Sequence, residues 1–99
     1  MDNKPYYLIG DVDIHNMEEY KIYMQNTKQI VEKYGGEYLV RGGAMDAKDT
    51  QLWKPTRMVL IKFPNKPSAD EFYQSEEYQP FKEMRHKNAS STMIFVESF

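Results

Sequence analysis

The chain has 99 residues, with 13 basic and 15 acidic side chains, a formal net charge of −2 and no cysteine. This length suits one domain, so we expect a single domain over residues 1–99 and exclude a two-domain enzyme. The near balance of charge disfavours nucleic acid and membrane partners, and the lack of cysteine excludes disulfides and thiolate metal sites. Because no stretch has the length and apolar composition of a membrane span, we expect a cytoplasmic protein.

The first half of the chain predicts a strand, a helix and a second strand. Residues 6–14 are rich in aromatic and β-branched side chains, which favour a strand. Asn16 is expected to cap a helix of roughly 19 residues, because apolar side chains then recur every three or four positions. Gly35-Gly36 supplies the residue that ends this helix. Residues 37–41 form the next predicted strand, which stops at a second glycine pair.

The second half predicts a strand, a helical region interrupted by proline, and a last strand. Residues 57–63 are mostly apolar and end at a proline, which indicates a strand. Ser68 is expected to cap a short helix. The main helix then begins near Gln79, with Pro80 at its first position, where the missing N–H removes no helical hydrogen bond. Residues 93–99 are predicted to form the final strand.

The order βαββαβ predicts the α+β class, in the form of a ferredoxin-like sandwich. In that arrangement a four-stranded antiparallel sheet carries both helices on one face. Three predicted strands nevertheless place adjacent apolar residues on opposite faces of the sheet: Leu8 and Ile9, Val59 and Leu60, Phe95 and Val96. Since two helices cover one face only, we expect a homodimer that pairs sheet to sheet. The alternative is that these residues lie at strand ends and are half exposed.

Several short motifs occur in a characteristic order and spacing: Asn16-x-x-x-Tyr20-x-x-Tyr23, Gly35-Gly36, Leu39-Val40-Arg41-Gly42-Gly43, Pro55-x-Arg57, Phe63-Pro64, Tyr73-x-Ser75-x-x-Tyr78 and Arg85. With these motifs the chain resembles the domain-of-unknown-function family DUF1330, within the dimeric α+β barrel superfamily. The resemblance implies a ferredoxin-like subunit that pairs through its sheet. Relatives in that superfamily include cofactor-free monooxygenases, lactone isomerases, haem-degrading enzymes and stress-response proteins, so the fold alone does not specify a reaction.

Standard catalytic signatures for hydrolases and nucleotide-binding enzymes are missing from the sequence. The histidines, His15 and His86, have no metal-ligand partner nearby in the sequence, and we expect both at the surface. Haem ligation by His86 is the alternative that haem-degrading relatives suggest. We expect no metal and no cofactor.

The arginines carry the strongest functional signal. Arg41 ends one predicted strand and Arg57 begins its antiparallel neighbour, so the two should lie at the same end of the sheet. Arg85 follows Phe81 by four residues, which places it on the helix face that packs on the sheet. Such cations need carboxylates or a bound anion. The alternative to a ligand is an intersubunit salt bridge or pairing with acids of the chain, for which the candidates are Asp11, Asp46, Glu71 and Glu77.

We therefore expect a small-molecule-binding protein whose ligand bears a carboxylate. By the resemblance, it would be a cofactor-independent enzyme, monooxygenase-like or isomerase-like, that acts on an acidic or phenolic metabolite. The expected ligand-binding residues are Tyr20, Arg41, Arg57, Tyr78 and Arg85. Trp53 is a further candidate for stacking on the ligand, and Asp11 for a base. The alternative function is a non-enzymatic dimeric binding or stress-associated module in which the arginines are structural.

Overall fold

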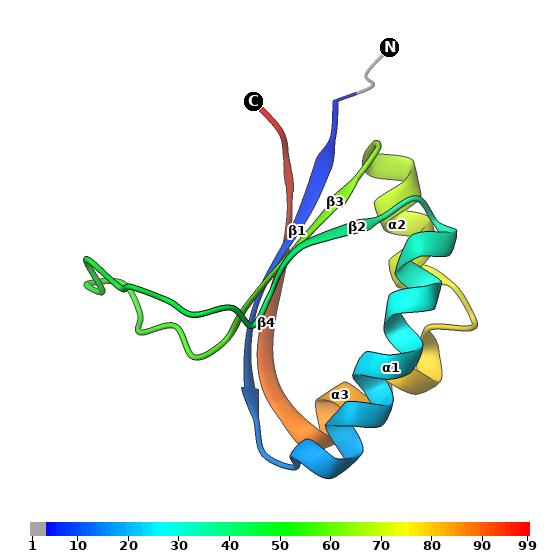
Figure 1. The fold of residues 1–99 in the computed structure, drawn as a ribbon. Coiled ribbons are helices and arrows are strands. Elements are labelled where there is room, and N and C mark those ends of the chain that lie inside the picture. Colours follow the sequence, from blue (N-terminus) through cyan, green and yellow to red (C-terminus); the bar gives the residue numbers. More distant parts are fainter. Residues whose placement is uncertain (1–3) are drawn as a thin grey trace.

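A computed structural model describes residues 4–99 and shows one sheet with three helices on one side of it (Figure 1). The elements are β1 (Tyr6–Ile14), α1 (Met17–Lys33), β2 (Glu37–Arg41), β3 (Met58–Phe63), α2 (Lys66–Gln74), α3 (Gln79–Asn88) and β4 (Ala89–Glu97). The four strands pair antiparallel in the order β2-β3-β1-β4. The predicted ferredoxin-like α+β fold is confirmed, with the second helical region divided into α2 and α3. None of the helices in the described part of the chain has the length and apolar character that crossing a membrane requires.

Helix α1 begins and ends close to where the sequence predicts. The Asn16 side chain accepts a hydrogen bond from the backbone N–H of Glu19 at 3.3 Å, which satisfies a donor that the first turn leaves free. The helix has 17 residues, and Gly35 follows it with a φ of 85°. That left-handed conformation favours glycine, and the chain turns there toward β2.

Two boundaries differ from the prediction. Helix α2 starts at Lys66, and its N-cap is Asn65, whose side chain accepts from the N–H of Ser68 at 2.9 Å. Ser68 is therefore inside the helix. Strand β4 starts at Ala89 and ends at Glu97, so it begins four residues before the predicted position and ends two residues earlier. Its first residues are small or polar and lack a strand pattern, but residues 89–92 pair in register with residues 14–11 at the end of β1.

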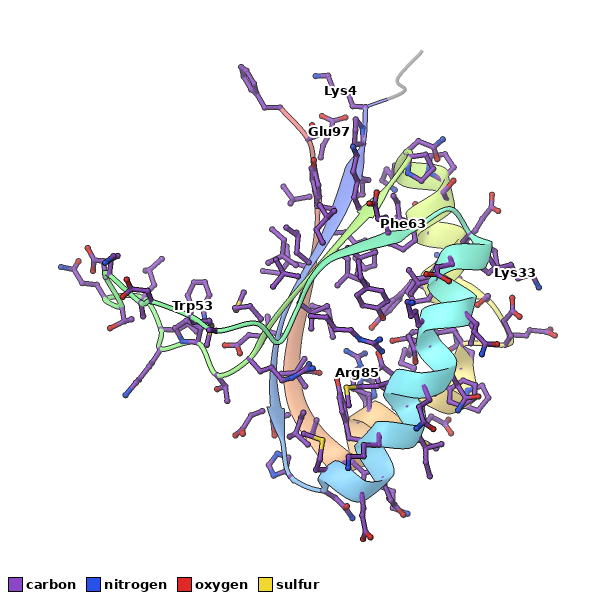
Figure 2. All side chains as sticks on the ribbon, in the orientation of Figure 1. Lys4, Lys33, Trp53, Phe63, Arg85 and Glu97 are labelled. Atoms are coloured by element: carbon purple, nitrogen blue, oxygen red, sulfur yellow. The ribbon has the colours of Figure 1, made fainter. Side chains whose placement is uncertain are left out.

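The main core lies between the sheet and the helices. Alternate residues of β1 and β3 point into it, because successive side chains in a strand point to opposite faces. Its largest members from the helices are aromatic. The buried residues are Leu8, Val12, Val59, Ile61 and Phe63 from the sheet and Tyr20, Tyr23, Val31, Phe72 and Tyr78 from the helices. Phe63 is labelled in this layer in Figure 2.

The opposite side of the sheet, which we call the open face, carries an apolar row across all four strands. Val40 pairs with Leu60, Leu60 with Ile9, and Ile9 with Ile94, and paired residues of antiparallel strands share a face. Ile94 is 55% exposed and Val40 38% exposed. The β2–β3 connection, residues 42–57, extends away from this side of the sheet (Figure 1), and we call it the arm.

Candidate functional site

A small cavity lies between the sheet and helix α1. Its volume is about 20 Å³, which holds roughly one water molecule. Four of the five residues that the sequence predicts for a ligand site, Tyr20, Arg41, Arg57 and Tyr78, line this cavity. The other lining residues are Leu8, Tyr23, Met24, Thr27, Tyr38, Val59, Ile61, Phe72 and Met93.

Arg41 and Arg57 lie together at one edge of the cavity. Arg41 Nη2 donates a hydrogen bond to the backbone carbonyl of Met24, and its guanidinium lies 4.5 Å from the centre of the Tyr38 ring. Arg57 Nη2 is 3.5 Å from Met24 Sδ. The Arg57 guanidinium also packs against Gly42, which directly follows Arg41. The expected proximity of these two side chains is present, and Met24 of α1 links them.

Arg85 is the most deeply buried of the three arginines, at 1% exposure. Its side chain lies between the sheet and the helices (Figure 2). It donates to the hydroxyls of Ser91 at 3.2 Å and Tyr73 at 3.1 Å, and its Nη2 lies 3.3 Å from His86 Nε2. None of these partners is a carboxylate. Partial desolvation and then the charge of Arg85 lower the pKa of His86, so its imidazole is neutral at pH 7.

The acids that could neutralise the arginines are engaged elsewhere or lie apart from them. Glu77 pairs with Lys33 at 3.0 Å, and Asp46 with Lys48 at 2.6 Å. Within residues 4–99 no ion pair joins Arg41, Arg57 or Arg85 to a carboxylate. The alternative of pairing with acids of the same chain is therefore wrong for the described residues. Arg41 and Arg57 at the cavity, and Arg85 beside Ser91 and Tyr73, therefore have no opposite charge paired with them among these residues.

Tyr20 places its hydroxyl among these charges. Burial raises the pKa of Tyr20 to about 12, although Arg57, Arg85 and Arg41 each act to lower it. The residue is 2% exposed and lines the cavity, yet its hydroxyl makes no hydrogen bond to any other described residue. A neutral phenol with a free O–H at a positively charged cavity is suited to donate to an anion.

Two other tyrosine hydroxyls at the cavity hydrogen-bond to each other. Tyr23 and Tyr78 share a buried hydrogen bond of 2.8 Å between their hydroxyl oxygens. Burial raises the pKa of both residues, so both remain protonated at neutral pH. The Tyr73 ring lies 5.7 Å from the Tyr78 ring, centre to centre, and connects this pair to Arg85.

Asp11 and Trp53 lie on the other side of the sheet, so the expectation that they share a site with Arg41 and Arg57 is wrong. Asp11 alternates with Gly10 and Val12, which face the helices, and it points to the open face. Its Oδ1 accepts from the N–H groups of Thr56 at 2.9 Å and Arg57 at 3.1 Å, and its Oδ2 from the Trp53 indole at 2.9 Å. Through these hydrogen bonds the Asp11 carboxylate holds the arm against β1. Figure 2 shows Trp53 on the arm, across the sheet from Arg85.

Met24 and Tyr38 are lining residues that sequence reasoning did not assign to the site. Met24 belongs to the apolar stripe of α1, which indicates a core position but not contact with two arginines. Both histidines are exposed, with His15 Nε2 2.8 Å from the Ser90 hydroxyl. In the described residues no cluster of three His, Asp or Glu is arranged to hold a metal ion.

Comparison with known proteins identifies similar chains. The family model described as "Domain of unknown function (DUF1330)" matches residues 5–99. A protein of unknown function from Rhodopseudomonas palustris, RPA0582, is 15% identical over 99% of this chain and 85% of its own, with a TM-score of 0.77. SnoaB, a cofactor-independent oxygenase from Streptomyces nogalater, is 11% identical over 97% and 94%, with a TM-score of 0.66.

A third solved structure bears on assembly. It is described as a dimeric protein of unknown function and ferredoxin-like fold from Bacteroides fragilis, 13% identical over 95% of this chain and 96% of its own, with a TM-score of 0.55. At these identities the likeness shows the fold alone. No protein of curated function matches the chain.

Proposed function

The chain belongs to the DUF1330 family, and we propose that it binds a small carboxylate-bearing or phenolic molecule in the cavity between sheet and helices. The observation that carries this proposal is that the guanidiniums of Arg41 and Arg57 line the cavity, that Arg85 is buried nearby, and that none of the three has a carboxylate partner among the described residues. These are the chain's three arginines. A bound anion supplies the opposite charge that the protein does not.

Met24 and Met93 make room for the ligand. The cavity of about 20 Å³ is too small for a metabolite, and both methionines line it. Methionine side chains are unbranched and adaptable, so they can rotate out of such a space at small cost. Arg57 loses only a weak contact to Met24 Sδ when this happens, because sulfur is a poor acceptor.

The same groups are suited to cofactor-independent chemistry on the ligand. Guanidinium and phenol donors stabilise negative charge on an oxygen atom, and such charge develops when a phenol or a carbonyl compound loses a proton. SnoaB, which has the same fold, is a cofactor-independent oxygenase. Its likeness supports oxygenase-type chemistry here, whereas isomerase-type chemistry rests on the charge-stabilising donors of the cavity alone.

We also propose that two copies pair through the open face. The apolar row of Val40, Leu60, Ile9 and Ile94 is left uncovered by the helices, and Val96 beside it is 43% exposed. Apolar patches of this kind on a soluble domain commonly mark interfaces. The dimeric ferredoxin-like neighbour from Bacteroides fragilis supports this proposal.

A second candidate function is a dimeric binding module in which the arginines serve the fold. One observation favours it: Arg41 of β2 donates to the Met24 carbonyl of α1, so it fastens a helix to the sheet. On this view Arg57 packs between Gly42 and Met24 for the same purpose. The two candidates differ in what removal of Arg57 does in the absence of any ligand.

A thermal-shift experiment separates them. Wild type, Arg57→Ala and Lys54→Ala are heated with a panel of small aliphatic and aromatic carboxylates and phenols; Lys54 is an exposed arm cation and controls for net charge. A ligand at 100 times its dissociation constant stabilises the protein by about 2.7 kcal/mol. A selective shift that Arg57→Ala loses and Lys54→Ala keeps supports the proposal. No shift with any compound, together with a destabilised Arg57→Ala, overturns it in favour of the second candidate.

A further inference from the structure

Arg85 is a buried cation whose hydrogen bonds all go to neutral groups. Its side chain is 1% exposed, and its Nη atoms contact Ser91, Tyr73 and His86. Its Nε is buried and has no hydrogen-bond partner within residues 4–99. The carbonyl end of helix α3, where Arg85 lies, offsets part of the charge. The offset does not give the Nε–H of Arg85 a hydrogen-bond acceptor. A buried donor without an acceptor is costly, unless a ligand accepts from it.

Arg85 does not line the cavity of Arg41 and Arg57, but the residues that it contacts adjoin residues that do: its partner Tyr73 packs near Tyr78, which lines the cavity. Ser91, its partner on β4, lies two residues before Met93, so both side chains are on the helix-facing side of the sheet. Met93 lines the cavity and lies over Gly10, where a Cβ would come within 2.5 Å of the Met93 sulfur. Met93, a flexible side chain above a glycine, is thus both a wall of the cavity and the next residue after Ser91 on the helix-facing side of β4.

The Tyr20 hydroxyl lies close enough to both regions, the cavity and the surroundings of Arg85, to interact with the charges in each. Arg41, Arg57 and Arg85 each act to lower its pKa, and it has no hydrogen-bond partner among the described residues. A ligand that displaces Met93 would therefore meet two arginines at one end, a free phenol O–H along its length and a third arginine at the other end.

We propose that the ligand is a dianion: one anionic group binds Arg41 and Arg57, and a second binds Arg85 through its free Nε–H. This inference rests on the proposed function, since it concerns the same cavity, and it narrows the ligand class from carboxylates in general to dicarboxylates and related dianions. A monoanion leaves the buried charge of Arg85 unpaired, whereas a dianion of suitable length neutralises both ends.

The first test compares dicarboxylates with monocarboxylates of equal chain length by titration calorimetry, from malonate to pimelate. At the best length the wild type should bind the dicarboxylate at least about tenfold more tightly, because the second charged group adds charge-assisted hydrogen bonds. Arg85→Met should abolish this preference. Lys87→Met, which removes an exposed cation two residues along the chain, should retain it.

A second measurement uses the wild type and does not depend on the Arg85 variant folding. The chain's three arginines give three Nε–H signals in a nitrogen-15 NMR spectrum, assigned with Arg57→Ala and Arg41→Ala. The dicarboxylate should shift all three signals, and the monocarboxylate only those of Arg41 and Arg57.

The outcomes separate this inference from the proposed function. If neither type of acid moves the Arg57 signal or binds measurably, the proposed function fails. If both acids move the Arg57 signal but the dicarboxylate binds no better and leaves the Arg85 signal in place, the cavity takes a monoanion and the dianion proposal is wrong. Loss of the preference in Lys87→Met as well as in Arg85→Met would also overturn it, because net charge would then explain the preference.

Discussion

Arg57 packs its guanidinium directly on the backbone of Gly42. A Cβ atom built on Gly42 would lie 2.5 Å from Arg57 Nε and 2.6 Å from its Cζ, and Gly42 has a φ of 73°. The turn that follows β2 therefore sets the position of the arginine that precedes β3. A glycine that the sequence suggests only as a strand end thus shapes the edge of the cavity.

The first prediction follows from this contact. Gly42→Ala should lower the free energy of unfolding by about 1–3 kcal/mol, because alanine must adopt a left-handed conformation and displace Arg57. Gly43→Ala is the matched control, since nothing lies within 4 Å of its Cβ position. Urea unfolding of both variants measures the difference. Equal stability of the two would contradict the packing described.

The second prediction concerns the hydroxyl pair of Tyr23 and Tyr78. Tyr23→Phe or Tyr78→Phe alone removes one hydroxyl and leaves the other buried without its partner at 2.8 Å. Each single variant should therefore lower the free energy of unfolding by about 1–3 kcal/mol. The double variant should cost less than the sum, because both members of the pair are gone. A double-mutant cycle by chemical denaturation checks this. Additive losses would show that the two hydroxyls are not coupled.

The third prediction concerns Asp11 and acid. Burial alone would raise the pKa of Asp11, but hydrogen bonds from Arg57, Thr56 and Trp53 together lower it below 3.8. Because the folded pKa is the lower one, the carboxylate stabilises the fold above pH 3.8 and this contribution is lost as the pH falls through the folded pKa. Trp53 is the chain's one tryptophan, so its fluorescence reports release of the arm.

A pair of variants tests that assignment. Asp11→Ala should change the Trp53 emission at neutral pH, because the indole loses the carboxylate at 2.9 Å. Asp13→Ala, an exposed aspartate on the same side of β1, should leave the emission unchanged. Identical spectra for wild type and Asp11→Ala would show that the arm is not held by this contact.

The fourth prediction concerns the open face. Ile94→Lys places a charge in the apolar row and should raise the dimer dissociation constant by more than about tenfold in sedimentation equilibrium. Ile22→Lys is the control, because Ile22 is similarly exposed at 47% but lies on α1, away from that face. A wild type that is monomeric at micromolar concentration would refute the dimer, and equal effects of the two variants would place the interface elsewhere.

The fifth prediction concerns alkaline pH. The pKa of Tyr20 is raised from 10.0 to about 12, so the folded state holds a proton that the unfolded state has lost between these values. The free energy of unfolding should therefore fall as the pH rises from about 10 to about 12. Tyr20→Phe should reduce that slope and remove one late-ionising tyrosine from an absorbance titration. An unchanged titration would mean that Tyr20 ionises outside this range.

The elements that local pattern controls were predictable from the sequence. The strand over residues 6–14, the Asn16 cap and the glycine end of α1 depend on side chains within a few positions of one another. The start of β4 at Ala89 was not predictable in this way, because its small polar residues are strand only by pairing with β1.

The amino-acid sequence by itself determined the α+β class, the order of the elements and the placing of Arg41 and Arg57 at one end of the sheet, since antiparallel neighbours share their ends. The tertiary structure decided three further points: that Asp11 faces away from the arginines, that Met24 joins two of them, and that no described acid pairs with Arg85. These depend on which strand face and which rotamer each side chain adopts. Those choices are made by packing between segments far apart in the chain, which local sequence does not encode.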